Sequence, residues 1–229
     1  MTTTISTPTP ATHDRAVSRN VWRAAGGLAL AHVVLMFAGF SQEVAVEHGT
    51  AADSVLRSYG GANLTRVMAG GYVESMSFLV LLPAVVLVAW CFGRTTPAGR
   101  VAAQSFLALG VVYIASTLAV GMPPEAAALY AAQHGADGPT VVGINDIRNY
   151  SFYLQVATSC AMALALGIAA LAERVFVRWV GWLGCALGLV GVVATPFAHN
   201  PLSLAFVIWW VGLAVLCLRG GPSPDRRTS

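Results

Sequence analysis

The chain has 229 residues, of which 56% are hydrophobic and only 10% are charged. A water-soluble domain carries about 25% charged residues, so this composition excludes one and indicates an integral membrane protein whose partner is the lipid bilayer. Motifs for hydrolysis, phosphate binding and dinucleotide binding are missing, and no basic patch has interleaved aromatic residues. The four cysteines lack the spacing of a metal site. We therefore expect no cofactor, no metal and no nucleic-acid partner.

The hydrophobic residues fall into six segments, and about 17–25 apolar residues are enough to cross the hydrocarbon core. Residues 1–20 are rich in Thr, Ser and Pro and are predicted to form a disordered tail, and residues 219–229 form a second tail. The sequence predicts an all-α fold, a bundle of six transmembrane helices within residues 21–218. The six predicted spans are residues 24–40, 67–92, 101–120, 147–172, 180–197 and 202–218.

Two long polar loops are predicted on one side of the membrane, and only short turns on the other. The first loop, residues 41–66, contains a short surface helix at 52–59, and Asn63 is expected to cap the second span. The second loop covers residues 122–145 and contains an Ala-rich helix around residues 125–133, and Asn145 or Asp146 is expected to cap the fourth span.

Arginine is distributed unevenly between the two sides of the predicted bundle. All 13 basic residues are arginine, and only Arg57, Arg66 and Arg148 belong to the side with the long loops. Because cytoplasmic loops carry the excess of positive charge, both termini are expected in the cytoplasm. The lack of lysine is typical of a GC-rich genome and favours the bacterial cytoplasmic (inner) membrane.

Glu74 is the residue that points most directly to a function. At 1.5 Å of rise per residue it lies about 9 Å from the midplane, in the half of the second span nearer the long loops. An ionised carboxylate at this depth costs at least a few kcal/mol unless it faces protein, water or a partner. Thr117 and Gln155 lie at about the same depth on the third and fourth spans, and Tyr113 lies slightly deeper.

Polar residues form a stripe along the fourth span, from the depth of Glu74 to the end of the span nearer the long loops. Arg148, Ser151 and Gln155 have i, i+3, i+7 spacing and therefore share one helix face. Arg66 and Glu74 share a face of the second span. We expect the two polar faces to meet and to enclose a cavity, with Glu74 at its floor and Arg66 and Arg148 at its mouth.

Three interpretations of Glu74 stay open. In the first, Glu74 lines a water-accessible pocket that binds or passes a small cationic or amphipathic molecule or a proton. In the second, Glu74 pairs directly with Arg148, Arg66 or Gln155 and only holds helices together in a structural or accessory subunit. In the third, it is the acid or base of an intramembrane enzyme, although no nucleophile or metal-ligand cluster accompanies it.

Two further patterns concern packing. A glycine face on the fifth span allows close contact between helices, and we expect it to pack within the fold rather than to form a homodimer seam. We interpret His32, near the middle of the first span, as a hydrogen-bonding core residue, because His199 is about 17 Å too far along the membrane normal to share a haem with it. The residues of the glycine face are Gly181, Gly184, Gly188 and Gly191.

Four features occur together in the chain after residue 20. They are the helix at 52–59 followed by Asn63, the early Glu74 of the second span, Arg148 at the start of the fourth, and the run RWVGWLG from residue 178. In these features the chain resembles a family of small bacterial integral membrane proteins with about six spans and a domain of unknown function. Family members often have Pro before the basic-Trp pair, where this chain has Val. The resemblance implies the fold and a bacterial membrane, and it implies no activity.

Overall fold

A computed structural model describes residues 17–44, 46–176 and 178–221 of the chain. Regular structure in these residues is entirely helical, which confirms the predicted all-α fold. Five helical segments are long and apolar enough to cross a membrane, which indicates a multi-pass membrane protein. The elements are α1 (Arg19–Phe40), α2 (Ala52–Gly60), α3 (Leu64–Cys91), α4 (Pro97–Ser116), the π-helical turn η1 (Thr117–Gly121), α5 (Met122–Gln133), α6 (Gly138–Glu173) and α7 (Arg178–Leu218).

Polar side chains cap the N-termini of several helices. The Oδ1 atom of Asn63 accepts a hydrogen bond from the backbone N–H of Arg66 at 3.0 Å, so the predicted cap of α3 is confirmed. Helix α2 matches the helix predicted at 52–59. The predicted tail 1–20 lies largely outside the described residues, and its last two residues, Arg19 and Asn20, already belong to α1.

The helix expected at 125–133 within the predicted loop 122–145 is confirmed by α5, but the loop is much shorter than predicted, because α6 already begins at Gly138. The turn η1 and α5 continue α4 as far as Gln133, and α6 begins at Gly138. Asp137, not Asn145, caps α6 by accepting a hydrogen bond from the N–H of Thr140. At 1.5 Å per residue the 36 residues of α6 span about 54 Å, well beyond a hydrocarbon core of about 30 Å. Helical turns outside the bilayer are stabilised by packing against other parts of the protein and do not need to be apolar throughout. For this reason hydropathy does not predict them.

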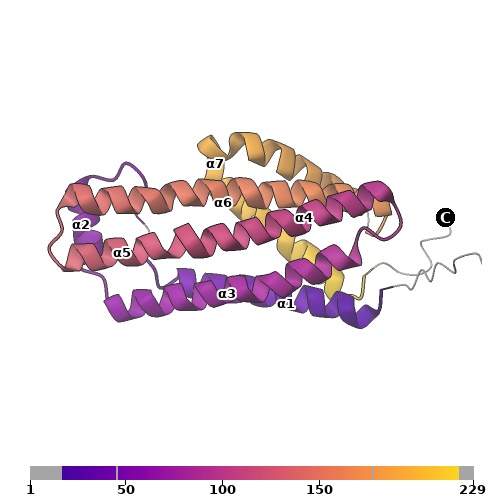
Figure 1. Cartoon of the computed structure of the whole chain (residues 1–229), viewed down its shortest axis with the longest axis horizontal. Helices are drawn as coiled ribbons and strands as arrows, with labels where there is room; N and C mark the ends of the chain where they lie inside the picture. Colours follow the sequence, from indigo (N-terminus) through magenta and orange to yellow (C-terminus); the bar gives the residue numbers. More distant parts are fainter. Residues whose placement is uncertain (1–16, 45, 177, 222–229) are drawn as a thin grey trace, which may run out of the picture.

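Those packing partners form a compact layer at the end of the molecule away from the chain termini (Figure 1). We call this layer, made of α2, α5 and the first turns of α6, the distal head. Tyr59 is fully buried there and its hydroxyl donates to Oδ1 of Asn145 at 2.8 Å. The head has its own hydrophobic cluster, whose buried members are Val46, Val55, Tyr59, Val67, Ala128, Leu129 and Val141.

Helix α7 has 41 residues and a sharp corner (Figure 1). Ala198 leaves helical geometry, with φ −144° and ψ 35°, and prolines at 196 and 201 flank it. The corner lies between the predicted spans 180–197 and 202–218. The first limb of α7 packs along α6, and the second limb returns to α1, where Gly26 faces the backbone of Ala214.

The glycine face of α7 lies against α6. A Cβ atom added at Gly188 would lie 2.6 Å from the carbonyl oxygen of Cys160, and one at Gly184 would lie 2.9 Å from that of Ala163. Such distances leave no room for a side chain, so the glycines set the spacing of the two helices. Gly181 and Gly191 also face α6 residues.

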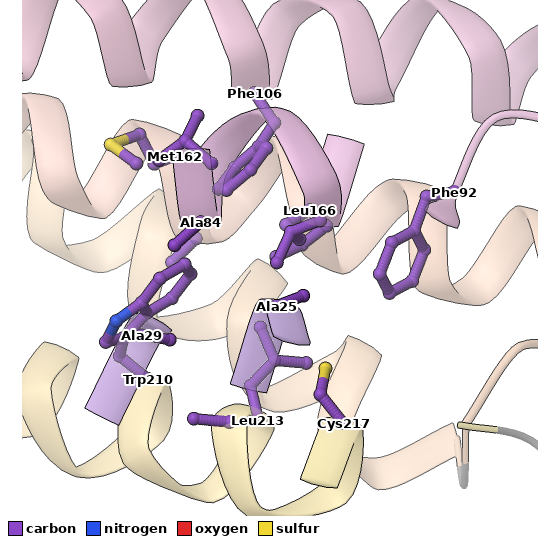
Figure 2. Close-up of a cluster of buried hydrophobic side chains, with 14 of the residues drawn as sticks. Ala25, Ala29, Ala84, Phe92, Phe106, Met162, Leu166, Trp210, Leu213 and Cys217 are labelled. Atoms are coloured by element: carbon purple, nitrogen blue, oxygen red, sulfur yellow. The ribbon is translucent and has the colours of Figure 1, made fainter. Parts of the chain in front are cut away.

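The main hydrophobic core joins α1, α3, α4, α6 and both limbs of α7, and Figure 2 shows a cluster of its side chains. Phe106, Met162 and Leu166 are buried at its centre, and Leu213 joins them from the second limb of α7. Trp210 lies at one edge of the cluster in this view. The core thus holds the helices together on one side of the distal half of the bundle. The distal half itself is built differently.

Candidate functional site

A cavity of about 550 Å³ occupies the distal half of the bundle. Its walls come from α1, α3, α6 and the second limb of α7, and the loop after α1 closes its end beneath the distal head. Glu43 and Glu74 lie on its surface, and His32 and Trp210 line it farther from the head.

Two glycines bring Glu43 and Glu74 together. A Cβ atom at Gly39 would lie 2.6 Å from the carbonyl oxygen of Gly70, and one at Gly70 would lie 2.8 Å from that of Gly39. The end of α1 therefore crosses the start of α3 at backbone contact, as small residues allow in membrane helices. Glu74 follows Gly70 by one turn of α3, and the chain that leaves α1 carries Glu43 past it.

Arg148 of α6 connects this pair to the distal head. Its Nη2 atom lies 3.4 Å from Oε2 of Glu43, and its Nε atom lies 2.9 Å from Oε2 of Glu125 at the start of α5. The other oxygen of Glu125 accepts a hydrogen bond of 3.1 Å from the backbone N–H of Val44. One guanidinium thus joins the loop, α5 and α6.

All the acidic side chains of this cluster are buried. The side chains of Glu43 and Glu125 are 2% and 5% exposed, and Glu74 is 7% exposed. Both Glu43 and Glu74 line the cavity, and Oε1 of Glu43 has no hydrogen-bond partner among the described residues. Burial, together with the smaller effect of the neighbouring Glu74, raises the pKa of Glu43 from 4.5 to about 8 against the opposing effects of Glu125 and Arg148. Glu43 therefore holds a proton at neutral pH.

The charges of the cluster do not balance. Three carboxyl groups, from Glu43, Glu74 and Glu125, face the single guanidinium of Arg148. Burial also raises the pKa of Glu125, to about 7, so protons as well as Arg148 compensate the acidic side chains of the cluster. A buried group of this composition can hold an additional cation or an additional proton, because either one compensates the unpaired carboxylate.

Five of the residues predicted from the sequence line the cavity. Glu74 and Tyr113 face it from α3 and α4, and the stripe on α6 faces it through Arg148, Ser151 and Gln155. The hydroxyl of Ser151 donates to the backbone carbonyl of Arg148 at 2.7 Å.

Two predicted residues lie elsewhere. Thr117 is buried in η1, where its hydroxyl donates to the carbonyl oxygen of Tyr113 at 2.8 Å. Arg66 lies on the exposed side of α3 and donates through Nε to Oε1 of Gln42 at 2.7 Å, so it is not at the mouth of the cavity. Arg148, which was also expected beside Glu74, is ion-paired with Glu43 and Glu125 instead.

Glu43 and Glu125 are the site residues that the sequence did not reveal. Both lie in segments that were predicted to be polar loops. Acidic residues are common in such loops, so their positions alone did not indicate a site. One signal was present for each. Glu43 follows the first apolar span by three residues, and Glu125 follows two prolines at the start of an Ala-rich stretch, where a helix begins.

Two nitrogen atoms on the cavity wall have no hydrogen-bond partner among the residues that the structure describes. They are Nε1 of Trp210, a residue that is 3% exposed, and Nδ1 of His199. An oxygen of Glu74, Oε2, is equally without a partner in the described part of the chain. Buried polar atoms are usually satisfied, so unpartnered ones on a cavity wall indicate that the cavity receives something polar.

Comparisons of the chain with family models, with curated proteins and with solved structures found no match. The family resemblance described from the sequence therefore stays a prediction. What the site does has to be inferred from its own geometry.

Proposed function

We propose that this is a six-span protein of the bacterial cytoplasmic membrane whose cavity binds, or passes, a small cationic and amphipathic molecule or a proton. The observation that carries the proposal is the excess of buried carboxyl groups over guanidinium groups on a cavity wall. Glu43, Glu74 and Glu125 face Arg148 alone. A cation bound beside Glu74 compensates the remaining charge, and the alternative is an unpaired ion at hydrocarbon depth.

Aromatic rings on the cavity wall favour a cation with an apolar body. Phe78 packs edge to face on Tyr113 with ring centroids 5.6 Å apart, and Phe206 stacks on Trp210 at 6.2 Å. Such rings attract a weakly hydrated organic cation through their negative faces. The unpartnered indole N–H of Trp210 supplies a hydrogen-bond donor for the same molecule.

The route into the cavity also suits an amphipathic ligand. Phe37 of α1 and Leu204 of α7 line the cavity and are 47% and 58% exposed. The wall between α1 and the second limb of α7 is therefore open toward the side that faces lipid. A molecule dissolved in one leaflet reaches the carboxylates without crossing the distal head.

The six-span arrangement rests on α7. At 1.5 Å per residue its 41 residues span about 61 Å, twice the hydrocarbon thickness, and the corner at Ala198 divides it into two limbs of nearly equal length. Together with the arginine asymmetry, two crossings by α7 support a cytoplasmic location of both termini. A reporter active only in the cytoplasm is expected to function when fused at Thr96 or Ser229 and to fail at His134. Activity at His134 would contradict the proposed topology.

Binding is tested with a charged probe and its neutral counterpart. Benzyltrimethylammonium is an aromatic cation, and neopentylbenzene has the same shape without the charge. The full chain in detergent micelles is expected to bind the first and not the second in calorimetric titration. Glu74→Gln is expected to abolish binding, whereas Asp53→Asn, which removes an exposed carboxylate of α2, is the matched control and should bind normally. Equal binding of both probes would refute a carboxylate-based site.

The contacts of Arg148 favour a second candidate, a structural role. Arg148 forms ion pairs with Glu43 and Glu125, and the backbone N–H of Val44 donates a hydrogen bond to Glu125. These contacts link the loop after α1 to α5 and α6. In a purely structural or accessory subunit the cluster would only hold the distal head in place. Substitutions of Glu74 would then lower thermal stability without any effect on a bound probe, because no probe binds.

A further inference from the structure

We infer that His32 and Trp210 form a hydroxyl-binding subsite in the cavity, so that the molecule bound beside Glu74 is an organic cation with a hydroxyl group beyond its charged end. This inference rests on the proposed function and adds to it the class of ligand. His32 is 4% exposed and Trp210 is 3% exposed, and both line the cavity. A buried polar side chain on a cavity wall needs a hydrogen-bond partner, which a bound ligand supplies.

Two contacts fix the imidazole ring of His32. Its Nδ1 atom lies 3.0 Å from the backbone carbonyl oxygen of Ser77, and the ring packs edge to face on Phe78 with centroids 5.2 Å apart. A carbonyl oxygen only accepts, so in a neutral imidazole the hydrogen is on Nδ1 and Nε2 carries the lone pair. The neutral form suits the middle of a membrane span, where a charged side chain is costly. Within the described residues nothing donates to Nε2, which is therefore left to accept a hydrogen bond from a ligand.

Trp210 supplies the complementary group. Its indole N–H is a donor only, and it has no acceptor in the part of the chain that the structure describes. Phe92 follows the end of α3 that is remote from the distal head. Figure 2 shows the indole nitrogen on the side of the ring away from Phe92, and therefore on the side of the distal half that contains the cavity.

His32 and Trp210 come from facing turns of two antiparallel helices. Gly26 of α1 faces the backbone of Ala214 on the second limb of α7. One turn farther along α1 corresponds to one turn back along α7, so Trp210 lies opposite the turn of α1 that contains Ala29 and His32. Ala29 and Trp210 accordingly belong to the same buried cluster (Figure 2).

A hydroxyl group satisfies both side chains at once. Nε2 of His32 accepts and the indole N–H of Trp210 donates, so the ligand group has to donate to the first and accept from the second. An ammonium group only donates, and an ether oxygen only accepts. A hydroxyl does both and is small enough to lie between two facing helices.

The subsite lies about one turn of α3 from Glu74. Ser77, whose carbonyl oxygen holds His32, follows Glu74 by three residues, which is about 4.5 Å along the helix axis. Because helical side chains lean toward the N-terminus, the carboxyl group of Glu74 lies farther from His32 than this rise. The charged nitrogen and the hydroxyl therefore belong to opposite ends of one ligand. Phe78 and Phe206 line the cavity and suit the apolar part between these ends.

The test compares three probes that share one scaffold. Benzyltrimethylammonium has no polar group on its ring, its 3-hydroxy derivative has a donor and an acceptor, and its 3-methoxy derivative has an acceptor only. The full chain in detergent micelles is titrated calorimetrically with each probe. We expect the hydroxyl to tighten binding about tenfold and the methoxy group to give no such gain.

Two results of this titration would contradict different claims. Equal affinity for the unsubstituted and hydroxylated probes, or an equal gain from the methoxy group, overturns the hydroxyl subsite and leaves the proposed function intact. Failure to bind any of the three probes refutes the proposed function itself.

Substitutions at the subsite are compared through the ratio of the dissociation constants of the unsubstituted and hydroxylated probes. A loosened fold weakens both and leaves this ratio unchanged, so the ratio reports recognition of the hydroxyl. His32→Phe keeps an aromatic ring beside Phe78 and removes Nε2, and Trp210→Phe removes the indole N–H. Each is expected to reduce the ratio severalfold.

A second variant and a control complete the design. His32→Asn has an amide that can donate to Ser77 as Nδ1 does, but it has no atom at the place of Nε2, so it is expected to reduce the ratio like His32→Phe. His134→Phe changes an exposed histidine after α5 in the same way and should keep the tenfold ratio. A ratio that persists in both His32 variants contradicts the inference. So does a ratio that is lost in His199→Phe instead, because the hydroxyl is then held by the other histidine of the cavity wall.

Discussion

Replacement of Glu43 by glutamine is expected to stabilise the protein in mildly alkaline solution and to leave its stability nearly unchanged in acid. Glutamine has almost the shape of a protonated glutamate and, like it, carries no charge. Glu43→Gln therefore preserves the contacts of the protonated cluster and removes the group that titrates. The side chain is 2% exposed, so solvent does little to screen the effect.

The size of the effect follows from the two pKa values of Glu43. Its pKa is about 8 in the folded protein and 4.5 for the unperturbed group, so the folded state binds the proton more tightly. The resulting stabilisation is fully present below pH 4.5 and is lost as the pH rises through 8. At about 1.4 kcal/mol for each tenfold change in proton affinity, the wild type loses about 5 kcal/mol over this range, and Glu43→Gln does not.

Unfolding in mixed micelles with increasing fractions of a denaturing detergent, followed by near-ultraviolet circular dichroism, measures this difference. The wild type and Glu43→Gln should coincide at pH 5, and the variant should be several kcal/mol more stable at pH 8.5. Asp53→Asn, which neutralises an exposed carboxylate, should follow the wild type at both pH values. If Glu43→Gln is instead the less stable protein at pH 8.5, Glu43 is an ionised partner of Arg148, and loss of a buried ion pair explains the result.

Three further outcomes are expected. Gly188→Leu should lower the free energy of unfolding by about 1–3 kcal/mol because the new side chain collides with α6. Leu189→Ala, at a position 65% exposed, should change the free energy of unfolding little. Equal effects of the two substitutions would place the glycine face against lipid. Glu74→Cys, in a chain without the four native cysteines, should react with a membrane-impermeant thiol reagent added from outside, and protection from the reagent would indicate a sealed cavity. Tyr59→Phe removes the hydrogen bond to Asn145 and should cost about 1 kcal/mol, detected as faster hydrogen exchange in the distal head than elsewhere.

Much of the transmembrane architecture follows from local sequence, and the site follows only in part. Apolar length and the caps at residues such as Asn63 are local properties, so the helices that cross the bilayer could be predicted. Glu74 was conspicuous because a carboxylate within an apolar run is costly. The polar stripe through Arg148 on α6 was likewise visible from spacing alone.

The remainder of the site depends on contacts between distant parts of the chain. Glu43 and Arg148 are 105 residues apart, and nothing near either residue specifies the other. Their contact depends on the crossing at Gly39 and Gly70 and on the extension of α6 beyond the bilayer. Hydropathy marks where a chain leaves the membrane but not how its helices pack there, so a helix beginning near Glu125 could be predicted but its contact with Arg148 could not.

The corner at Ala198 has a consequence for biogenesis. Chains leave the ribosome from the N-terminus, and the wall of the cavity contributed by Leu204, Phe206 and Trp210 belongs to the segment that is synthesised last. The opposite wall, on α1, is synthesised first. Until the second limb of α7 inserts, Glu74 has no enclosing wall on that side and stays accessible to lipid headgroups and water. A nascent chain arrested before the corner should therefore lack this wall of the cavity.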